Sequence, residues 1–299
     1  MSFLPDFYSF WKKAKDLPLQ ERIKLWDELF EAKHPDFYRE VIYAGKEGEI
    51  LRQFKEQKLQ NFLSELTEKN ILEMKAREQE LTKLIPLVAQ KVDKVFPPKR
   101  EETTHYIIPS LNVTSGAGSP YRDDLIIFYG IEFMVQFDDP GYIKEMIAHQ
   151  ILHVIHYRKI APFLWKKYGA NRNLNVLLDR EGPLFFIFRE GLAISFAEGL
   201  FPGGDRPGIR EKNVPVFEES FQNYTKKFLQ DLRNFTPEVY ENYFSGTQEN
   251  SEPPGFGFFL GYKIVKSFLQ VYPMEELIRW SPERAVQAVW SETKKIIDK

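Results

Sequence analysis

The segment between Asp139 and Pro162 constrains the fold more than any other part of the chain, because it combines clear helix signals with a cluster of histidines. Asp139 is a suitable N-cap, and Pro140 suits the first helical position. Arg158 and Lys159 lie where positive charge stabilises the end of a helix, shortly before the next proline. We therefore expect one helix that begins after Asp139 and ends before Pro162.

Three of the five histidines, His149, His153 and His156, lie on this expected helix. At about 100° per residue, His153 is turned roughly 40° from His149 and His156 roughly 20° in the other direction, so all three share one face. Two imidazoles at i and i+4 can bind one cation at about 2.0–2.1 Å, a geometry that zinc accepts. The order His149-Gln150-Ile151-Leu152-His153 is the H-E-x-x-H pattern of zinc peptidases with glutamine in place of glutamate.

A zinc ion held by two histidines needs a third ligand from another element. Glu190 is the best candidate, because it lies on an expected helix of its own from Leu184 to Leu200. Two histidines and one glutamate leave a fourth position for water or a substrate carbonyl, as in catalytic zinc sites. His156 is an alternative ligand, although its place beside His149 suits a core or supporting role better.

Two other interpretations compete with zinc. Paired histidines also occur in the cores of metal-free helical proteins, where the imidazoles are simply packed. A di-iron bundle requires Glu-x-x-His at i, i+3 on two helices, whereas Glu145 precedes His149 by four residues and no second copy exists. The sequence thus favours a single zinc ion per chain.

The composition excludes several kinds of site and partner. With 299 residues, of which 43% are hydrophobic, the chain can bury a core in one large domain or two modest ones. The absence of cysteine excludes disulfides, thiolate metal ligands and thiol catalysis. The 41 Lys and Arg against 43 Asp and Glu give a net charge of −2, which argues against a nucleic-acid partner.

The sequence also favours a cytoplasmic protein without a membrane partner. No apolar run reaches the ~18 residues of a membrane span, and the longest one, Leu125 to Val135, contains Glu132. The start, from Met1 to Asp6, lacks the basic and apolar regions of a signal peptide. The oligomeric state is left open.

The expected fold class is α+β, mainly helical. Residues 1–98 form an N-terminal helical region, and residues 99–299 form the metal-bearing domain, either separately or as one continuous domain. Two strand-like runs, His105–Ile108 and Leu125–Phe133, precede the histidine helix. The loop between them, Ser115–Pro120, is interpreted as a turn, and the C-terminal part again has the pattern of helices.

These features together resemble the gluzincin metallopeptidases, and specifically a bacterial family of predicted zinc-dependent proteases of unknown function. The resemblance is carried, in order along the chain, by Phe7-Tyr8-Ser9-Phe10-Trp11, the strand before the motif helix, His149 to His153, Glu190-Gly191-Leu192-Ala193 and Gly261-Tyr262-Lys263-Ile264-Val265. It implies a zincin-like fold with a small sheet and two metal-bearing helices. It also implies one Zn²⁺ per chain, bound by His149, His153 and Glu190.

The resemblance further implies a peptide or protein as substrate or ligand. The strand that contains Ile126, Phe128 and Gly130 would be an edge strand that binds an extended peptide by strand addition. Tyr262 is a candidate for stabilising the oxyanion, as tyrosine or histidine does in related enzymes, and the position of Phe258 is the other one considered. Tyr262 also suits a plain core role.

Gln150 is the departure from the family pattern. The glutamate at this position takes a proton from the attacking water and passes it to the leaving amine. Glutamine can orient the water, but its amide cannot accept the proton. Since general-base catalysis contributes about 10²–10⁴-fold, metal binding would remain while hydrolysis is strongly impaired.

Three explanations of Gln150 stay open. It marks a natural protein that no longer cleaves peptides, an engineered inactive form, or a site in which Glu145 acts as the base through an intervening water. The alternative function is a non-catalytic module that binds a peptide or a partner on a peptidase scaffold. Restoring glutamate at position 150 discriminates between a switched-off enzyme and a binding module.

Overall fold

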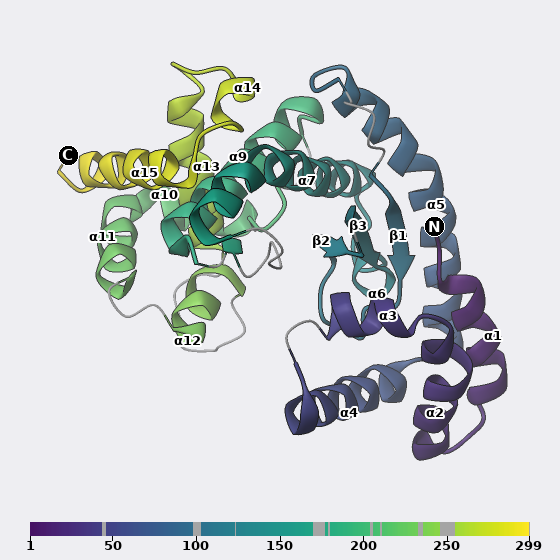
Figure 1. Ribbon diagram of the computed structural model, residues 1–299. Helices are drawn as coiled ribbons and strands as arrows, with labels where there is room; N and C mark the ends of the chain where they lie inside the picture. Colours follow the sequence, from purple (N-terminus) through teal and green to yellow (C-terminus); the bar gives the residue numbers. More distant parts are fainter. Residues whose placement is uncertain are drawn as a thin grey trace. The chain divides into compact units, whose positions relative to one another are not determined.

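The strands pair into one small sheet that follows a run of helices and precedes another (Figure 1). The computed structural model describes residues 1–43, 46–97, 103–122, 124–169, 177–178, 180–203, 206–209, 211–232, 236–245 and 255–298. The chain divides into two compact units, Met1–Gln90 with Pro98–Asp138 and Lys91–Pro97 with Asp139–Lys299. The architecture is α+β and mainly helical, as the sequence predicts.

The first unit holds the sheet and the N-terminal helices. Its elements are α1 (Leu4–Ala14), α2 (Leu19–Leu25), the π-helix η1 (Trp26–Phe30), the 3₁₀-helix η2 (Glu31–Lys33), α3 (Pro35–Phe37), the π-helix η3 (Tyr38–Ile42), α4 (Gly48–Glu65), α5 (Glu68–Asp93, to Gln90), β1 (His105–Ile108), β2 (Gly116–Tyr121), β3 (Asp124–Gly130) and α6 (Ile131–Met134). Aromatic rings from α1 and η1 form its core, where Phe7 and Phe10 pack on the fully buried Trp26. The aromatic start of the chain is therefore a core feature.

The strand order is β1-β3-β2, with β1 parallel and β2 antiparallel to β3. The predicted strand at His105–Ile108 is confirmed as β1, whereas the one predicted to reach Phe133 ends at Gly130, where α6 follows. The interpretation of Ser115–Pro120 as a turn is wrong, because most of this segment forms β2. A proline is tolerated in β2 because its nitrogen points away from β3. Gly130 N donates to Ser115 O, so Ser115 belongs to a hydrogen-bonded pair. Such pairs alternate along an antiparallel ladder, which leaves Pro120, opposite Leu125, in a pair without hydrogen bonds.

The prediction of an edge strand at Ile126, Phe128 and Gly130 is also wrong. These residues belong to β3, which is the middle strand of the sheet. Ile126 pairs with Ser119 of β2 on one side, and Phe128 pairs with Tyr106 of β1 on the other. Because β3 has a paired strand along both of its sides, it offers no row of free backbone groups to an added peptide.

A buried carboxylate fixes the loop between β1 and β2. Glu132 of α6 accepts hydrogen bonds from the backbone N–H of Ser110 (3.0 Å) and from its hydroxyl (2.7 Å). It also accepts one from the N–H of Asn112 (2.8 Å). Leu111 and Asn112 have the left-handed backbone angles φ 58° and φ 54°, so the loop depends on these bonds to hold an unfavourable turn. Burial raises the pKa of Glu132, and the three donors oppose that rise.

We predict that Glu132→Gln lowers the free energy of unfolding by about 1–3 kcal/mol, because the amide nitrogen cannot accept the bond from a buried donor. Glu28→Gln is the control, since Glu28 is exposed and its change should stay within about 0.5 kcal/mol. Urea unfolding followed by circular dichroism measures both. Equal midpoints for the two variants would show that the carboxylate does not hold the loop.

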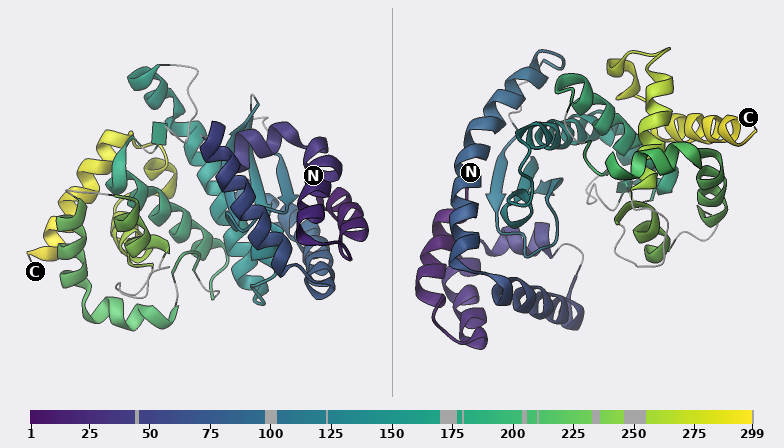
Figure 2. Two further views of the ribbon diagram at one scale, coloured as in Figure 1. Left: turned by 90° about the horizontal axis from the view of Figure 1, so that it is seen from below. Right: turned by 180° about the vertical axis from the view of Figure 1, so that it is seen from behind.

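The second unit is made of helices. Its elements are α7 (Pro140–Tyr168), α9 (Gly182–Leu200), the 3₁₀-helix η4 (Glu211–Asn213), α10 (Val214–Glu219), α11 (Phe221–Asp231), α12 (Pro237–Tyr240), the π-helix η6 (Glu241–Ser245), α13 (Phe256–Phe268), α14 (Met274–Leu277) and α15 (Pro282–Ile297). Helix α9 is central, because it packs against α7, α13 and α15 (Figures 1 and 2). The helix predicted from Leu184 to Leu200 is confirmed as α9.

Helix α7 is longer than predicted. It begins as expected, with the Asp139 side chain accepting hydrogen bonds from Gly141 N and Tyr142 N, but it continues through Pro162 to Tyr168. A proline removes one helical hydrogen bond. Burial of the flanking apolar residues, such as Ile160 and Leu164, offsets that loss.

The predicted domain boundary after residue 98 lies outside the described residues and stays a prediction. The sheet nevertheless groups with the N-terminal helices. Ser2 forms a bridge with Ile107 of β1, and the hydroxyl of Tyr38 donates to the carbonyl of Pro109 (2.6 Å). These bonds join the sheet to residues on the N-terminal side of the predicted boundary. Among the described residues, no helix is long and apolar enough to cross a membrane.

Candidate metal centre

Helix α7 brings His149 and His153 together one turn apart. Both side chains are buried, at 5% exposure each. Their Nε2 atoms lie 2.9 Å from each other, and the two rings meet edge to face. The i, i+4 spacing read from the sequence therefore places both imidazoles on one face of the helix, as predicted.

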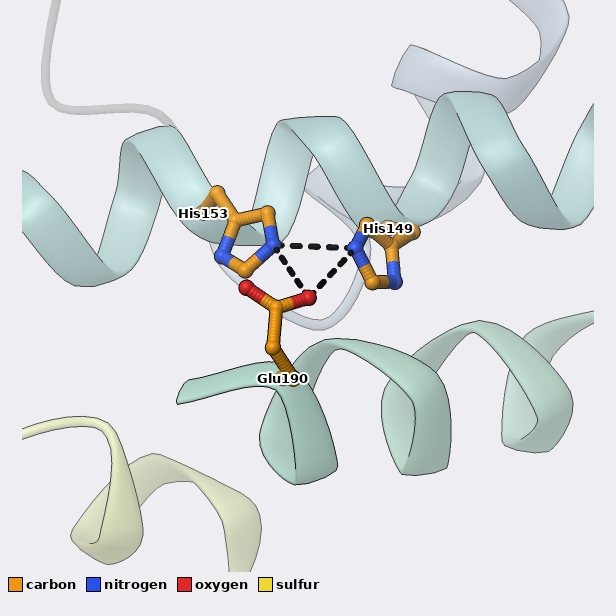
Figure 3. A group of neighbouring side chains, drawn as sticks. All are labelled: His149, His153 and Glu190. Carbon is orange, nitrogen blue, oxygen red and sulfur yellow. Dashed lines mark hydrogen bonds and ion pairs between the residues drawn. The ribbon is translucent and has the colours of Figure 1, made fainter. Parts of the chain in front are cut away.

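Glu190 reaches the histidines from α9. Figure 3 shows its carboxylate pointing from α9 into the space between the two imidazoles of α7. Glu190 Oε2 lies 3.3 Å from His149 Nε2 and 3.4 Å from His153 Nε2. Glu190 is 6% exposed, so this triad of donor atoms is enclosed by protein.

Two glycines set the position of α9 against α13. A Cβ atom on Gly191 would overlap the carbonyl of Gly261, and a Cβ atom on Gly261 would overlap the carbonyl of Ile187. The two backbones therefore touch where the helices cross, directly after Glu190. This contact explains physically why Glu190-Gly191 and Gly261, both part of the resemblance, occur together in the chain.

The electrostatics of the triad depend on its burial. Burial lowers the pKa of His153 to about 4, with the nearby charges of His149 and Arg189 adding to the effect and Glu190 opposing it. Burial alone would raise the pKa of Glu190, but the two imidazoles lower it well below its usual range. The site thus combines a carboxylate that stays charged with the His153 imidazole, whose protonation burial disfavours.

This donor set fits a divalent cation. The three donor atoms all lie within 4.8 Å of one another, which is the pattern of a metal-ligating group. Imidazole nitrogen and carboxylate oxygen are zinc ligands, and two histidines with one glutamate are the protein ligands of a catalytic zinc site. Within the part of the chain that is described, His149, His153 and Glu190 are the residues brought together in this way.

The Nδ1 atoms of the two histidines depart from the arrangement that is usual at metal sites. Metal-bound histidines commonly donate their second N–H to a carboxylate or a carbonyl. The Nδ1 atoms of His149 and His153 are buried and find no acceptor among the described residues. Packing therefore orients the rings, and Tyr157 stacks on His153 at 5.8 Å between ring centroids.

Gln150 follows His149 on α7 and is 7% exposed. Its amide nitrogen donates to the sulfur of Met146 at 3.8 Å. This contact uses the part of the side chain that a glutamate lacks, because a carboxylate has no N–H to donate. Position 150 is thus a buried neutral amide, adjacent in sequence to the first predicted ligand.

Tyr262 lies elsewhere on the α9–α13 interface. Its hydroxyl donates to the carboxylate of Glu198 at 2.8 and 2.9 Å, two helical turns beyond Glu190. Burial and the Glu198 carboxylate raise the pKa of Tyr262 to about 12, and Arg206 opposes the rise. The structure therefore does not bring this predicted oxyanion stabiliser to the three clustered residues.

His156 also stands apart from the triad. It is 1% exposed, and its ring lies near those of Phe185 and Phe188, at 5.9 and 6.1 Å. Neither of its ring nitrogens has a hydrogen-bond partner among the described residues. Burial lowers its pKa well below the usual range, so it is a neutral core residue here.

Two residues beside the triad were missed by the sequence reasoning. Tyr157 follows His153 by four positions and continues the stripe of the two histidines, a spacing that was readable from the sequence. Arg189 immediately precedes Glu190. Its charge within an otherwise apolar stretch of the helix could have marked it as a candidate site residue. Arg189 is 8% exposed, and its NH2 lies 3.7 Å from Glu190 Oε1, the carboxylate oxygen other than the one 3.3 to 3.4 Å from the histidines.

Comparison with known proteins places these observations in a family. A family model described as predicted Zn-dependent protease (DUF2268) matches residues 59–286, more than half of the chain and all three clustered residues. The chain belongs to this family. The resemblance inferred from the motifs is thereby confirmed. No curated protein and no solved structure matches the chain.

We predict that Gly191→Ala destabilises this family member by about 1–3 kcal/mol or more and weakens metal binding, because the added methyl group pushes α13 away and shifts Glu190. Gly199→Ala on the same helix is the matched control, since a Cβ atom there meets nothing within 4 Å. That change should leave stability unchanged or raise it by up to about 1 kcal/mol. Thermal unfolding and zinc titration measure both, and equal behaviour of the two variants would contradict the role of the crossing.

Proposed function

We propose that this chain binds one Zn²⁺ through His149, His153 and Glu190 and is built as a gluzincin-type metallopeptidase. We propose further that Gln150 leaves its peptide hydrolysis strongly impaired. The observation that carries the zinc site is the convergence of three buried donor atoms from α7 and α9, with separations of 2.9 to 3.4 Å. Membership of a family described as predicted Zn-dependent proteases supports it.

A cation at the triad also solves an electrostatic problem. Three polar atoms of possible ligands converge in a buried space, and a charged carboxylate is costly there unless it is paired. A divalent ion accepts all three lone pairs at once and compensates the charge of Glu190. When bound, zinc supplies Lewis acidity toward a peptide carbonyl and toward water.

The residues of the chain then have distinct tasks. His149 and His153 offer imidazole nitrogens, burial lowers the pKa of His153 to about 4, and Glu190 supplies the negative charge. The amide of Gln150 can hold a water by hydrogen bonding but cannot remove its proton. The step that needs a base at position 150 is therefore the step this chain lacks.

A second function is favoured by the same residue. If position 150 has no base, the scaffold can still bind a peptide or protein without cleaving it, as a binding module. The hydrogen bond from Gln150 Nε2 to Met146 Sδ supports this alternative, because it holds the amide by a contact that glutamate cannot make. Both functions use the same metal ligands and differ only in turnover.

His149→Ala should abolish stoichiometric zinc, because it removes one of three ligands and leaves a two-ligand site. Elemental mass spectrometry of the dialysed variant measures this. His156→Phe is the matched control on the same helix and should keep one zinc per chain, since His156 packs among phenylalanine rings outside the triad. Full retention of metal in His149→Ala would overturn the ligand assignment.

Gln150→Glu should raise peptidase activity by about 10²–10⁴-fold, the usual contribution of a general base. Hydrolysis of a fluorogenic casein substrate by the zinc-loaded variant measures the gain. The double variant His149→Ala/Gln150→Glu should show none of it, which separates zinc-dependent cleavage from a contaminating protease. No gain in the single variant, with zinc still bound, would favour the binding module over the switched-off enzyme.

A further inference from the structure

Arg189 is a buried cation with an incomplete set of hydrogen-bond acceptors among the described residues. Its guanidinium lies over the ring of Tyr157 at 5.1 Å and over that of Phe186 at 5.4 Å. Its NH2 reaches Glu190 Oε1 at 3.7 Å, which is longer than a good hydrogen bond. Its Nε is fully buried and has no acceptor among the described residues.

Arg206 of the same unit shows what a satisfied guanidinium looks like in this protein. It also lies over a tyrosine, with 4.8 Å to the ring of Tyr262. It donates from Nε and NH2 to both carboxylate oxygens of Glu211, at 2.8 and 2.9 Å. Among the described residues, Arg189 has the aromatic contacts without a two-point carboxylate partner.

A buried guanidinium N–H without an acceptor is costly, because a donor on a charged group has lost its water without gaining a partner. The aromatic rings compensate part of that cost and cover the flat surface of the group. The N–H groups at its edge remain directed in the plane of the guanidinium, where a carboxylate would accept two parallel bonds. Among the described residues, the Nε–H of Arg189 has no such acceptor.

The residues around Arg189 also favour a negatively charged ligand. Glu190 Oε2 faces the histidines and Oε1 faces Arg189, so a single carboxylate serves both the metal ligands and the arginine. Position 150, where an H-E-x-x-H site carries a glutamate, holds a neutral amide. With a divalent cation bound, the site thus carries more positive charge than Glu190 offsets, which favours an anionic ligand.

We propose that Arg189 forms a carboxylate-binding site next to the metal ligands, and that the ligand of this chain is a peptide with a free carboxylate bound there. This inference rests on the proposed function for the metal, but the arginine, its aromatic support and its unpaired N–H belong to the chain itself. Arg189 is a binding residue that selects the ligand. No bond is made or broken at it.

The test compares two probes that differ only in charge, acetyl-alanyl-phenylalanine and its C-terminal amide. Isothermal titration calorimetry of the zinc-loaded protein at pH 7 should show the free acid binding about tenfold to a hundredfold more tightly, the range of one hydrogen bond to a charged group. In Arg189→Gln most of this preference should disappear, with the zinc content unchanged. Arg206→Gln is the matched control and should keep the full preference.

A second readout is made on the wild-type protein and uses a variant only to assign one signal. In ¹H–¹⁵N spectra of the wild-type protein, the Nε–H signal of Arg189 should shift on addition of the acid and stay in place with the amide. Arg189→Lys identifies the signal by its loss, and it keeps the positive charge of the site. The same titration after zinc removal reports on the arginine alone.

The outcomes separate this inference from the proposed function. If the protein binds no zinc while the Nε–H signal still responds to the acid, the metal proposal fails and the carboxylate site stands. If zinc binds but the acid has no advantage over the amide, the carboxylate site is overturned. An acid preference that persists undiminished in Arg189→Gln would likewise overturn it, because the metal alone would then bind the carboxylate.

Discussion

Glu190 keeps its negative charge in a place from which water is largely excluded, and the arrangement around it follows from that constraint. A buried carboxylate is stable only when partners compensate its charge. Here one oxygen faces two imidazoles and the other faces a guanidinium. A divalent metal ion between the carboxylate and the two imidazoles would bind all three groups and offset the cost of burying the carboxylate.

The helices hold this arrangement by close packing. The capped start of α7 places the two histidines on one face, and the contact of Gly191 with Gly261 lets α9 and α13 approach until their backbones touch. Side chains that pack so tightly cannot shift by much, so the ligand geometry is pre-organised. Such rigidity suits a metal site of either kind, catalytic or purely binding. Gln150 changes which chemistry the same frame can support.

Much of this site could be predicted from the sequence, because i, i+4 histidines and helix caps are local features. The positions of the strands in the sheet were harder to predict from the sequence. Gly116 to Tyr121 has little strand propensity and becomes β2 only through its pairing with β3. The central place of β3 depends on β1, which is not its neighbour along the chain. Arg189 was missed for a related reason, since only its neighbours in space show that its N–H groups lack an acceptor.

The central claim is that the triad exists to hold a metal. The most direct measurement is the metal content of wild-type protein purified without added metal or an affinity tag, determined by elemental mass spectrometry. The account predicts about one zinc per chain, retained through dialysis and removed by a strong chelator. A protein that stays free of metal after dialysis against micromolar zinc would contradict it, and the buried histidines would then be core residues with no part in peptide chemistry.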